Sequence, residues 1–215
     1  MHQTNSVGED SLNSLTQIRQ GLDYLGSLDP VLKVIIDQVG EVPLRKREGG
    51  FDALVGMIVS QQISVAAANS ILNRLKNHGL TEAKNVIRAQ DKQLKACGLS
   101  PQKISYIRNL AQAGIDFDEL HKQSSQEVIN QLTAVKGIGL WTAEIYLMFS
   151  MGRKDVFAAG DLALQEATKV LLGLDKRPTE KELRAIAIKW SPWQGVAARL
   201  LWAYYRMVKK REGIR

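Results

Sequence analysis

The sequence has almost no cysteine and no long apolar run. Cys97 is the only cysteine among 215 residues, which excludes a disulfide within the chain, an iron–sulfur cluster held by four cysteines and a zinc ribbon. Residues 1–14, MHQTNSVGEDSLNS, lack the apolar core of a signal peptide, and no later stretch is long and apolar enough to cross a bilayer. These absences predict an intracellular protein, cytoplasmic or nuclear, that is neither secreted nor anchored in a membrane.

The chain also lacks any convincing alternation of apolar and polar residues, the pattern typical of half-buried β-strands. Apolar residues instead recur at helical spacing, as at Leu15, Ile18, Leu22 and Leu25. Signals for helix starts are frequent: Asp29-Pro30, Ser100-Pro101, capping boxes at Ser124-Ser125-Gln126-Glu127 and Thr179-Glu180-Lys181-Glu182, and Ser191-Pro192. With 45% apolar residues, the sequence predicts an all-α protein with a substantial core.

The charge of the chain is biased toward the positive sign. Lysine and arginine total 29 against 22 aspartates and glutamates, a net charge of +7. This bias suits a polyanionic partner, although a solvated basic surface has the same composition. The run EVPLRKREGG, residues 41–50, breaks the helical pattern and is predicted to be a linker or surface loop. Residues 1 to about 12 are polar and are expected to be loosely held.

The most informative stretch lies between Leu132 and Asp161. It reads as the end of one helix, a tight turn at Lys136-Gly137-Ile138-Gly139, a second helix from about Leu140, and a loop that leads to the aspartate. Because glycine has no Cβ, the turn lets another backbone come close, and its amides at a helix N-terminus favour an anion such as a DNA phosphate. The same two glycines would also suit a plain helix cap.

The segment GIGLWTAEIYLMFSMGRKDVFAAGD, from Gly137 to Asp161, resembles the helix-hairpin-helix, the loop and the catalytic aspartate of the base-excision DNA glycosylase superfamily. Within it, the chain is similar to the 3-methyladenine DNA glycosylase II (AlkA-like) family. Three further segments support the resemblance: IVSQQISVAAA at 58–68, GLSPQKISYIRNLA at 98–111 and KWSPWQGVAARLLWAYY at 189–205. The resemblance implies hydrolysis of the N-glycosidic bond of alkylated purines, of the 3-methyladenine and 7-methylguanine type, in base excision repair of duplex DNA.

The resemblance also implies a fold. It predicts an all-α helix-hairpin-helix glycosylase of two lobes with a cleft between them, without the N-terminal β-domain that some relatives carry. Residues 51–150 would form a central lobe, and residues 1–50 together with 151–215 would form a second, discontinuous lobe. The expected partner is double-stranded DNA with alkylated bases, bound by a monomer that requires no cofactor.

Asp161 matches the catalytic aspartate of the family. A carboxylate at this place would stabilise the positive charge that develops on the sugar, activate a water molecule, or do both. The alternative is that Asp161 only caps the helix that follows it, and a capping aspartate that is rigidly held could serve both roles.

Two tryptophans match positions that line the base pocket in the family, Trp141 and Trp202. An electron-rich indole suits a cationic alkylated purine, although core packing is the simpler role for either residue. Bifunctional relatives have a lysine at the position of Trp141, whose amine forms a Schiff base with the sugar. Lys136 does not match that position, so the resemblance implies an enzyme without lyase activity. Trp190 and Trp193 are interpreted as structural.

Gln62 matches the position at which the family inserts a wedge into the DNA gap left by the extruded nucleotide. A solvent-facing glutamine at a helix end is the alternative. Ser64 is expected to cap the next helix and to offer its amide to a phosphate. Phosphate binding at the turn is assigned to Lys136 and to the amides of Gly137 and Gly139.

The family can also hold an alkali-metal ion, Na⁺ or K⁺, on backbone carbonyls of the hairpin. Residue by residue, these would be the carbonyls of Thr133, Val135 and Ile138, with a structural role for the ion. Two departures from the family leave the substrate range open: Gly160 replaces a second acid found in some relatives, and residues 157–159 contain no proline. The alternatives are a glycosylase for another lesion, such as an ethenylated or deaminated base, and a non-catalytic module that binds damaged DNA.

Overall fold

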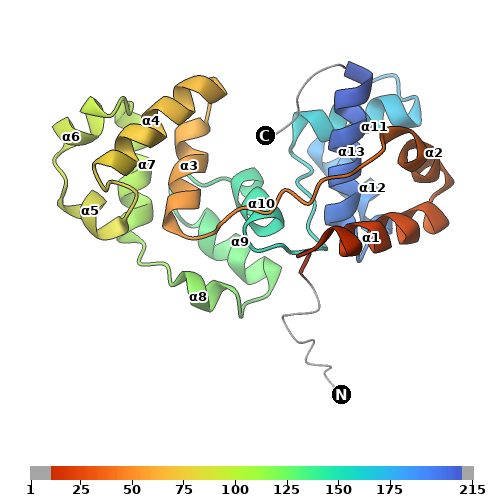
Figure 1. Cartoon of the computed structure of the whole chain (residues 1–215), viewed down its shortest axis with the longest axis horizontal. Helices are drawn as coiled ribbons and strands as arrows, with labels where there is room; N and C mark the ends of the chain where they lie inside the picture. The colour runs from red at the N-terminus through yellow and green to blue at the C-terminus, as the bar shows by residue number, and fades with distance from the viewer. Residues whose placement is uncertain (1–10, 210–215) are drawn as a thin grey trace. The chain divides into compact units, whose positions relative to one another are not determined.

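The computed structural model describes residues 11–209 of the chain, and within this range every regular element is a helix (Figure 1). The prediction of an all-α protein is confirmed. The only β-type pairing among these residues is an isolated bridge between Ser11 and Arg153. Leu12 is buried and its amide donates to the carbonyl of Gly152 at 2.6 Å, so the expectation of a loose chain is wrong for these last two residues. Residues 1–10, to which that expectation also applied, lie outside the described range.

The chain divides into two compact units. One, called here the central unit, comprises Arg47–Tyr146, and the other, the terminal unit, comprises Met1–Lys46 and Leu147–Arg215. Sequence reasoning placed these boundaries after residues 50 and 150, whereas the units change after residues 46 and 146. The first boundary falls inside the charged run 41–50, which forms no helix.

The central unit is built from helices joined by short turns. Their bounds are α3 Phe51–Ser60, α4 Val65–Asn77, α5 Ala83–Arg88, α6 Asp91–Ala96, α7 Pro101–Gln112, α8 Phe117–Leu120, α9 Ser125–Thr133 and α10 Leu140–Phe149, whose last residues belong to the terminal unit. Helix α7 packs against α3, α5 and α6, and α3 also packs against α4 (Figure 1). The most deeply buried side chains of this unit are apolar: Leu54, Val55, Ile58, Val59, Leu75, Val86, Leu94, Ile107, Val128, Leu132 and Ala143.

The terminal unit combines both ends of the chain. Its helices are α1 Leu15–Leu28, α2 Pro30–Val39, α11 Leu162–Leu172, α12 Glu180–Ala187 and α13 Gln194–Lys209, with a 3₁₀ turn at Ile188–Trp190. Helix α13, blue in Figure 1, packs against α1, α2 and α11, so it lies at the middle of this unit. Burying Leu200, Leu201 and Trp202 of α13 supplies much of the apolar core.

Helix starts follow the signals in the sequence. Asp29 caps α2 ahead of a proline, and both predicted capping boxes, at Ser124 and Thr179, are present with reciprocal hydrogen bonds. The prediction that the last helix begins at Ser191-Pro192 is wrong, because these two residues form a turn in which the amide of Trp193 donates to the carbonyl of Trp190 at 2.8 Å, and α13 begins only at Gln194. None of the helices in the described range has the length and apolarity needed to span a bilayer.

Candidate active site

Asp161 lies at the N-terminus of α11 in the terminal unit. Its side-chain Oδ1 accepts the backbone amides of Ala163 at 3.0 Å and Leu164 at 3.1 Å, so Asp161 is the N-cap of this helix. Only 6% of the residue is exposed. The capping role considered from the sequence is therefore present, and it fixes the orientation of the carboxylate.

Trp202, on α13, supplies a third donor to the same oxygen. Its indole Nε1 donates to Oδ1 of Asp161 at 3.0 Å. The ring is 1% exposed and packs against Phe149, with the ring centroids 5.5 Å apart. Trp202 is thus a buried partner of Asp161 as well as a core residue, whereas its role as a wall of the base pocket stays a prediction.

Arg199 lies one turn before Trp202 on α13 and holds the backbone next to Phe149. Its guanidinium lies over the Phe149 ring, 4.8 Å from the centroid, and donates to the carbonyls of Met148 at 2.7 Å and Leu44 at 3.0 Å. Burial lowers the pKa of Arg199 to about 10, so it remains charged at neutral pH. The carbonyls satisfy a buried charge that would otherwise be costly.

The turn that precedes Asp161 is buried and internally hydrogen-bonded. The amide of Ala159 donates to the carbonyl of Phe157, and the amide of Asp161 donates to that of Ala158, both at 2.9 Å. Gln165, also buried, donates its Nε2 to the carbonyl of Ala159 at 3.0 Å. These bonds order a loop that has no proline. Sequence reasoning missed Gln165, because its role depends on a turn whose shape only the fold defines.

The predicted hairpin is present in the central unit, between α9 and α10. Gly137 has φ +109°, and a Cβ at this position would collide with the ring of Tyr106 on α7. Gly137 is therefore required both by its backbone conformation and by this close contact. At Gly139, nothing lies within 4 Å of the position of a Cβ, and the residue is exposed together with Lys136. The far side of the turn is thus open to a ligand.

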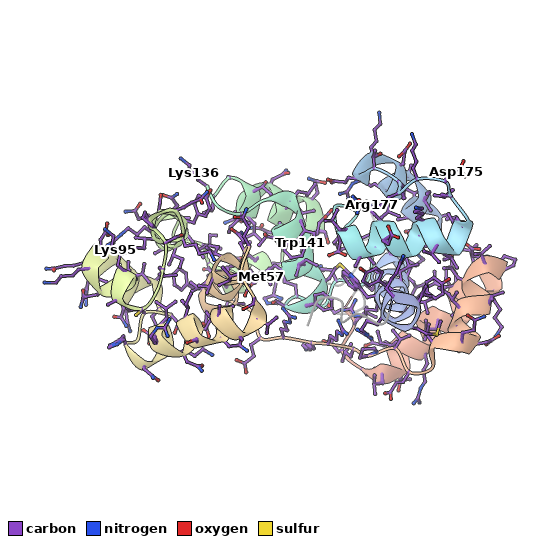
Figure 2. All side chains as sticks on the ribbon, turned by 90° about the horizontal axis from the view of Figure 1, so that it is seen from above. Met57, Lys95, Lys136, Trp141, Asp175 and Arg177 are labelled. Carbon is purple, nitrogen blue, oxygen red and sulfur yellow. The ribbon has the colours of Figure 1, made fainter. Side chains whose placement is uncertain are left out.

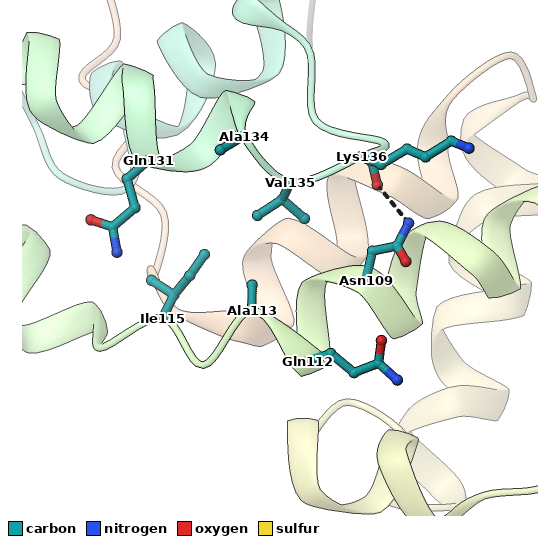
Figure 3. Close-up of a pocket in the computed structure, with 8 residues that line it drawn as sticks. All are labelled: Asn109, Gln112, Ala113, Ile115, Gln131, Ala134, Val135 and Lys136. Atoms are coloured by element: carbon teal, nitrogen blue, oxygen red, sulfur yellow. Dashed lines mark hydrogen bonds between the residues drawn. The ribbon is translucent and has the colours of Figure 1, made fainter.

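The turn is also tied to α7 through its backbone. Asn109 donates its Nδ2 to the carbonyl of Lys136 at 3.3 Å (Figure 3). Beside this bond is an open pocket of about 560 Å³ that combines amide and apolar side chains, lined by Asn109, Gln112, Ala113, Ile115, Gln131, Ala134, Val135 and Lys136.

Trp141, labelled in Figure 2, is the second residue of α10 and lies two positions after Gly139. It is half-buried, in contrast to Trp202. The stacking role of Trp141 stays a prediction.

Gln62 lies in the short loop between α3 and α4 and is exposed. Its φ of +59° is in the left-handed region, which costs a residue other than glycine roughly 1–2 kcal/mol. Ser64 caps α4 as predicted, since its side chain accepts the amide of Ala67 at 3.2 Å. The strain lies in the backbone of Gln62, and its role as a wedge stays a prediction.

No cluster of three or more His, Cys, Asp or Glu side chains suited to a metal ion occurs among residues 11–209. The carbonyl of Val135 accepts the amide of Ile138 at 3.0 Å, which leaves one of its two lone pairs for a cation. The hydroxyl of Thr133 donates to the carbonyl of Ile129 at 2.7 Å, so this side chain is directed along α9. These contacts are compatible with an ion on the backbone carbonyls.

Comparison with known proteins identifies the family of the chain. The family model described as HhH-GPD superfamily base excision DNA repair protein matches residues 55–192. The chain belongs to the HhH-GPD superfamily of base excision DNA repair proteins. DNA-3-methyladenine glycosylase 1 of Schizosaccharomyces pombe is 31% identical over 220 residues, which cover 96% of each chain.

Solved structures place the HhH-GPD fold of this chain among DNA glycosylases. A DNA-3-methyladenine glycosidase from Bacillus halodurans matches with a TM-score of 0.80 and 34% identity, covering 94% of both chains. The 3-methyladenine DNA glycosylase of S. pombe, in a complex with abasic DNA, matches with a TM-score of 0.76 and 30% identity, covering 88% of this chain and 97% of that one. The resemblance inferred from the Gly137–Asp161 segment is confirmed.

Proposed function

We propose that this HhH-GPD protein is a monofunctional DNA glycosylase that hydrolyses the N-glycosidic bond of alkylated purines, of the 3-methyladenine and 7-methylguanine type, in duplex DNA. The observation that carries the proposal is the carboxylate of Asp161, which is held by two helix amides and the Trp202 indole. Relatives named DNA-3-methyladenine glycosylase support the substrate class.

In the chemical step, the carboxylate of Asp161 acts at the sugar. As the bond between base and sugar breaks, positive charge develops on the sugar ring, and a fixed carboxylate stabilises that charge or takes a proton from the attacking water. The three donors hold Oδ1, so the carboxylate does not have to reorient during the reaction. An alkylated, cationic base departs as a neutral molecule, which makes it a good leaving group.

The central unit would bind the DNA. The exposed turn at Lys136–Gly139 offers backbone amides and one positive charge to a phosphate, and Ser64 at the N-terminus of α4 offers a second contact of the same kind. Gln62 would fill the gap left by the extruded nucleotide. Trp141 would stack on the damaged base, which is worth roughly 0.5–2 kcal/mol for a cationic purine.

The absence of lyase activity is proposed from the residue at position 141. A Schiff base with the sugar requires an amine there, and an indole cannot supply one. Borohydride treatment during the reaction should therefore trap no covalent protein–DNA adduct. A trapped adduct would contradict the monofunctional assignment.

A structural alkali-metal ion, Na⁺ or K⁺, is proposed on the carbonyls of Thr133, Val135 and Ile138. Such an ion would hold the hairpin carbonyls together and bridge them to a DNA phosphate. It has no role in the chemical step. If it is bound, exchanging K⁺ or Na⁺ for a bulky organic cation at constant ionic strength should weaken DNA binding.

The decisive experiment is base release from DNA treated with a methylating agent, with 3-methyladenine, 7-methylguanine and intact bases measured separately. The wild-type protein should release alkylpurines only. The Asp161→Asn variant should release alkylpurines far more slowly than the wild type. It should still bind abasic DNA, because asparagine is an equally good helix cap. Equal release by the variant would contradict the role of Asp161. Binding without release by the wild type would favour another lesion, or a non-catalytic DNA-binding module.

A further inference from the structure

The loop that carries Gln62 holds this residue in a conformation that a glutamine seldom adopts. Its φ is +59°, and its side chain is exposed at the tip of the loop between α3 and α4. Such a conformation persists only where the surrounding structure enforces it. The contacts on either side of Gln62 therefore indicate how its direction is set.

Lys103, on α7, contacts the chain immediately before Gln62. Its Nζ donates to the carbonyls of Val59 at 2.6 Å and Gln61 at 2.8 Å. These carbonyls lie at the C-terminal end of α3, where helical partners are missing and a cation is favourable. Lys103 is half-buried, and burial lowers the pKa of its ammonium group.

The second of these bonds fixes a peptide plane. The carbonyl of Gln61 and the amide nitrogen of Gln62 belong to the same planar peptide unit. When the Lys103 ammonium holds that oxygen, it also fixes the amide nitrogen of Gln62. This nitrogen is one end of the N–Cα bond about which φ of Gln62 is measured. Lys103 thus acts directly on the backbone orientation of Gln62.

The side chain of Gln61 joins the same loop to the hairpin. Its Nε2 donates to the carbonyl of Gly137 at 3.3 Å, and Gly137 rests on Tyr106 of α7. Asn109, another residue of α7, holds the carbonyl of Lys136. Three residues of α7, spaced by three, therefore support the loop and the hairpin together.

We propose that Lys103 is a positioning residue for the DNA wedge: through the Gln61–Gln62 peptide it aims Gln62, while α7 holds this loop in register with the phosphate-binding turn. This inference rests on the proposed function, in which Gln62 fills the gap in the duplex. Lys103 does not contact the reacting atoms in this role. It determines how often the wedge is in place when the nucleotide leaves the stack.

The test compares Lys103→Met, which keeps the aliphatic stem and removes the donor, with Lys103→Arg, which keeps donors. Lys95→Met removes one positive charge from the exposed face of α6 in the same unit and is the matched control. Thermal melts and circular dichroism identify any variant that fails to fold. Each variant is assayed by single-turnover base release from methylated duplex DNA and from the same oligonucleotide as a single strand.

Lys103→Met should release bases from the duplex about 10- to 100-fold more slowly, the usual cost of misplacing a group by about 1 Å, and at the wild-type rate from the single strand, where no gap has to be filled. Lys103→Arg should recover much of the duplex rate, and Lys95→Met should lose little of it. In a Gln62→Ala background, Lys103→Met should cause almost no further loss. An unchanged duplex rate, equal losses on both substrates, or full additivity with Gln62→Ala would overturn the proposal.

A second readout separates this inference from the proposed function. Fluorescence of 2-aminopurine placed beside a mispaired base reports nucleotide extrusion without any bond cleavage. If the wild type extrudes the nucleotide but releases no alkylpurine, the proposed activity fails while the role of Lys103 is still measured. Lys103→Met should then lower the fluorescence change upon binding, and an unaltered change would contradict the positioning role.

Discussion

The terminal unit contains two buried aspartates with nearly the same surroundings, Asp29 and Asp161. Each caps a helix, each accepts an indole N–H, from Trp190 at 3.2 Å and from Trp202 at 3.0 Å, and they are 7% and 6% exposed. In Asp161 the same oxygen, Oδ1, accepts both the helix amides and the indole N–H. In Asp29 the helix amide donates to Oδ1 and the indole N–H donates to Oδ2.

The contacts of Asp29 also include a cation. Oδ2 of Asp29 also forms an ion pair with Lys189 at 2.8 Å. These contacts of Asp29 thus occupy both carboxylate oxygens, as suits a structural residue. In this unit, a buried aspartate is thus held twice in the same way, as a helix N-cap that also accepts an indole N–H. Only its chemical surroundings then distinguish a stabilising role from a catalytic one.

The roles of the two aspartates are best distinguished by neutralising each of them in turn. Asp161→Asn should lower single-turnover base release by at least about 10²–10³-fold, the size of effect found when one charge-stabilising group is removed from a transition state. Asp29→Asn should leave the rate unchanged, since this residue has no role in the proposed reaction. Equal losses in both variants would show that the assay reports folding rather than chemistry.

The free energy of unfolding should fall more in Asp29→Asn than in Asp161→Asn. Asp29→Asn removes the ion pair with Lys189 and weakens the bond from Trp190, so it should reduce the free energy of unfolding by about 2 kcal/mol at pH 7, as measured by urea denaturation. Burial raises the pKa of Asp29, but the hydrogen bonds from Lys189 and Trp190 outweigh burial and hold that pKa below its ordinary value of 3.8.

This shift sets the pH dependence of the effect. Because the folded pKa lies below the unfolded value, the stabilisation is complete above the unfolded pKa and is lost as the pH falls through the folded pKa. The difference in stability between wild type and Asp29→Asn should therefore be constant near neutrality and shrink below pH 3.8. A difference that grows upon acidification would contradict the assigned direction.

The two indoles offer a finer comparison. Trp202→Phe keeps the ring packing against Phe149 but removes a hydrogen bond to a carboxylate, so base release should slow about tenfold. Trp190→Phe removes the corresponding bond to Asp29 and should lower the melting temperature without changing the rate. Slower release by Trp190→Phe at a temperature where it is fully folded would break the distinction.

Local signals made much of this protein predictable. The N-caps at Asp29, Ser64 and Asp161 and the glycine turn of the hairpin all depend on residues within four positions of one another, so sequence spacing is enough to identify them. The start of the last helix was predicted wrongly, because a Ser-Pro pair is also compatible with the turn that these residues form before α13 begins at Gln194.

The helical class, the helix caps, the hairpin and the family could therefore be predicted from the residues alone. The side chains that support them became known only from the packing of the helices: Trp202 on Asp161, Tyr106 beneath Gly137, and Lys103 on the peptide before Gln62. The physical reason is separation along the chain. A cap or a turn is formed by neighbouring residues, whereas a lysine 42 positions from the carbonyl that it holds becomes its partner only when the helices pack.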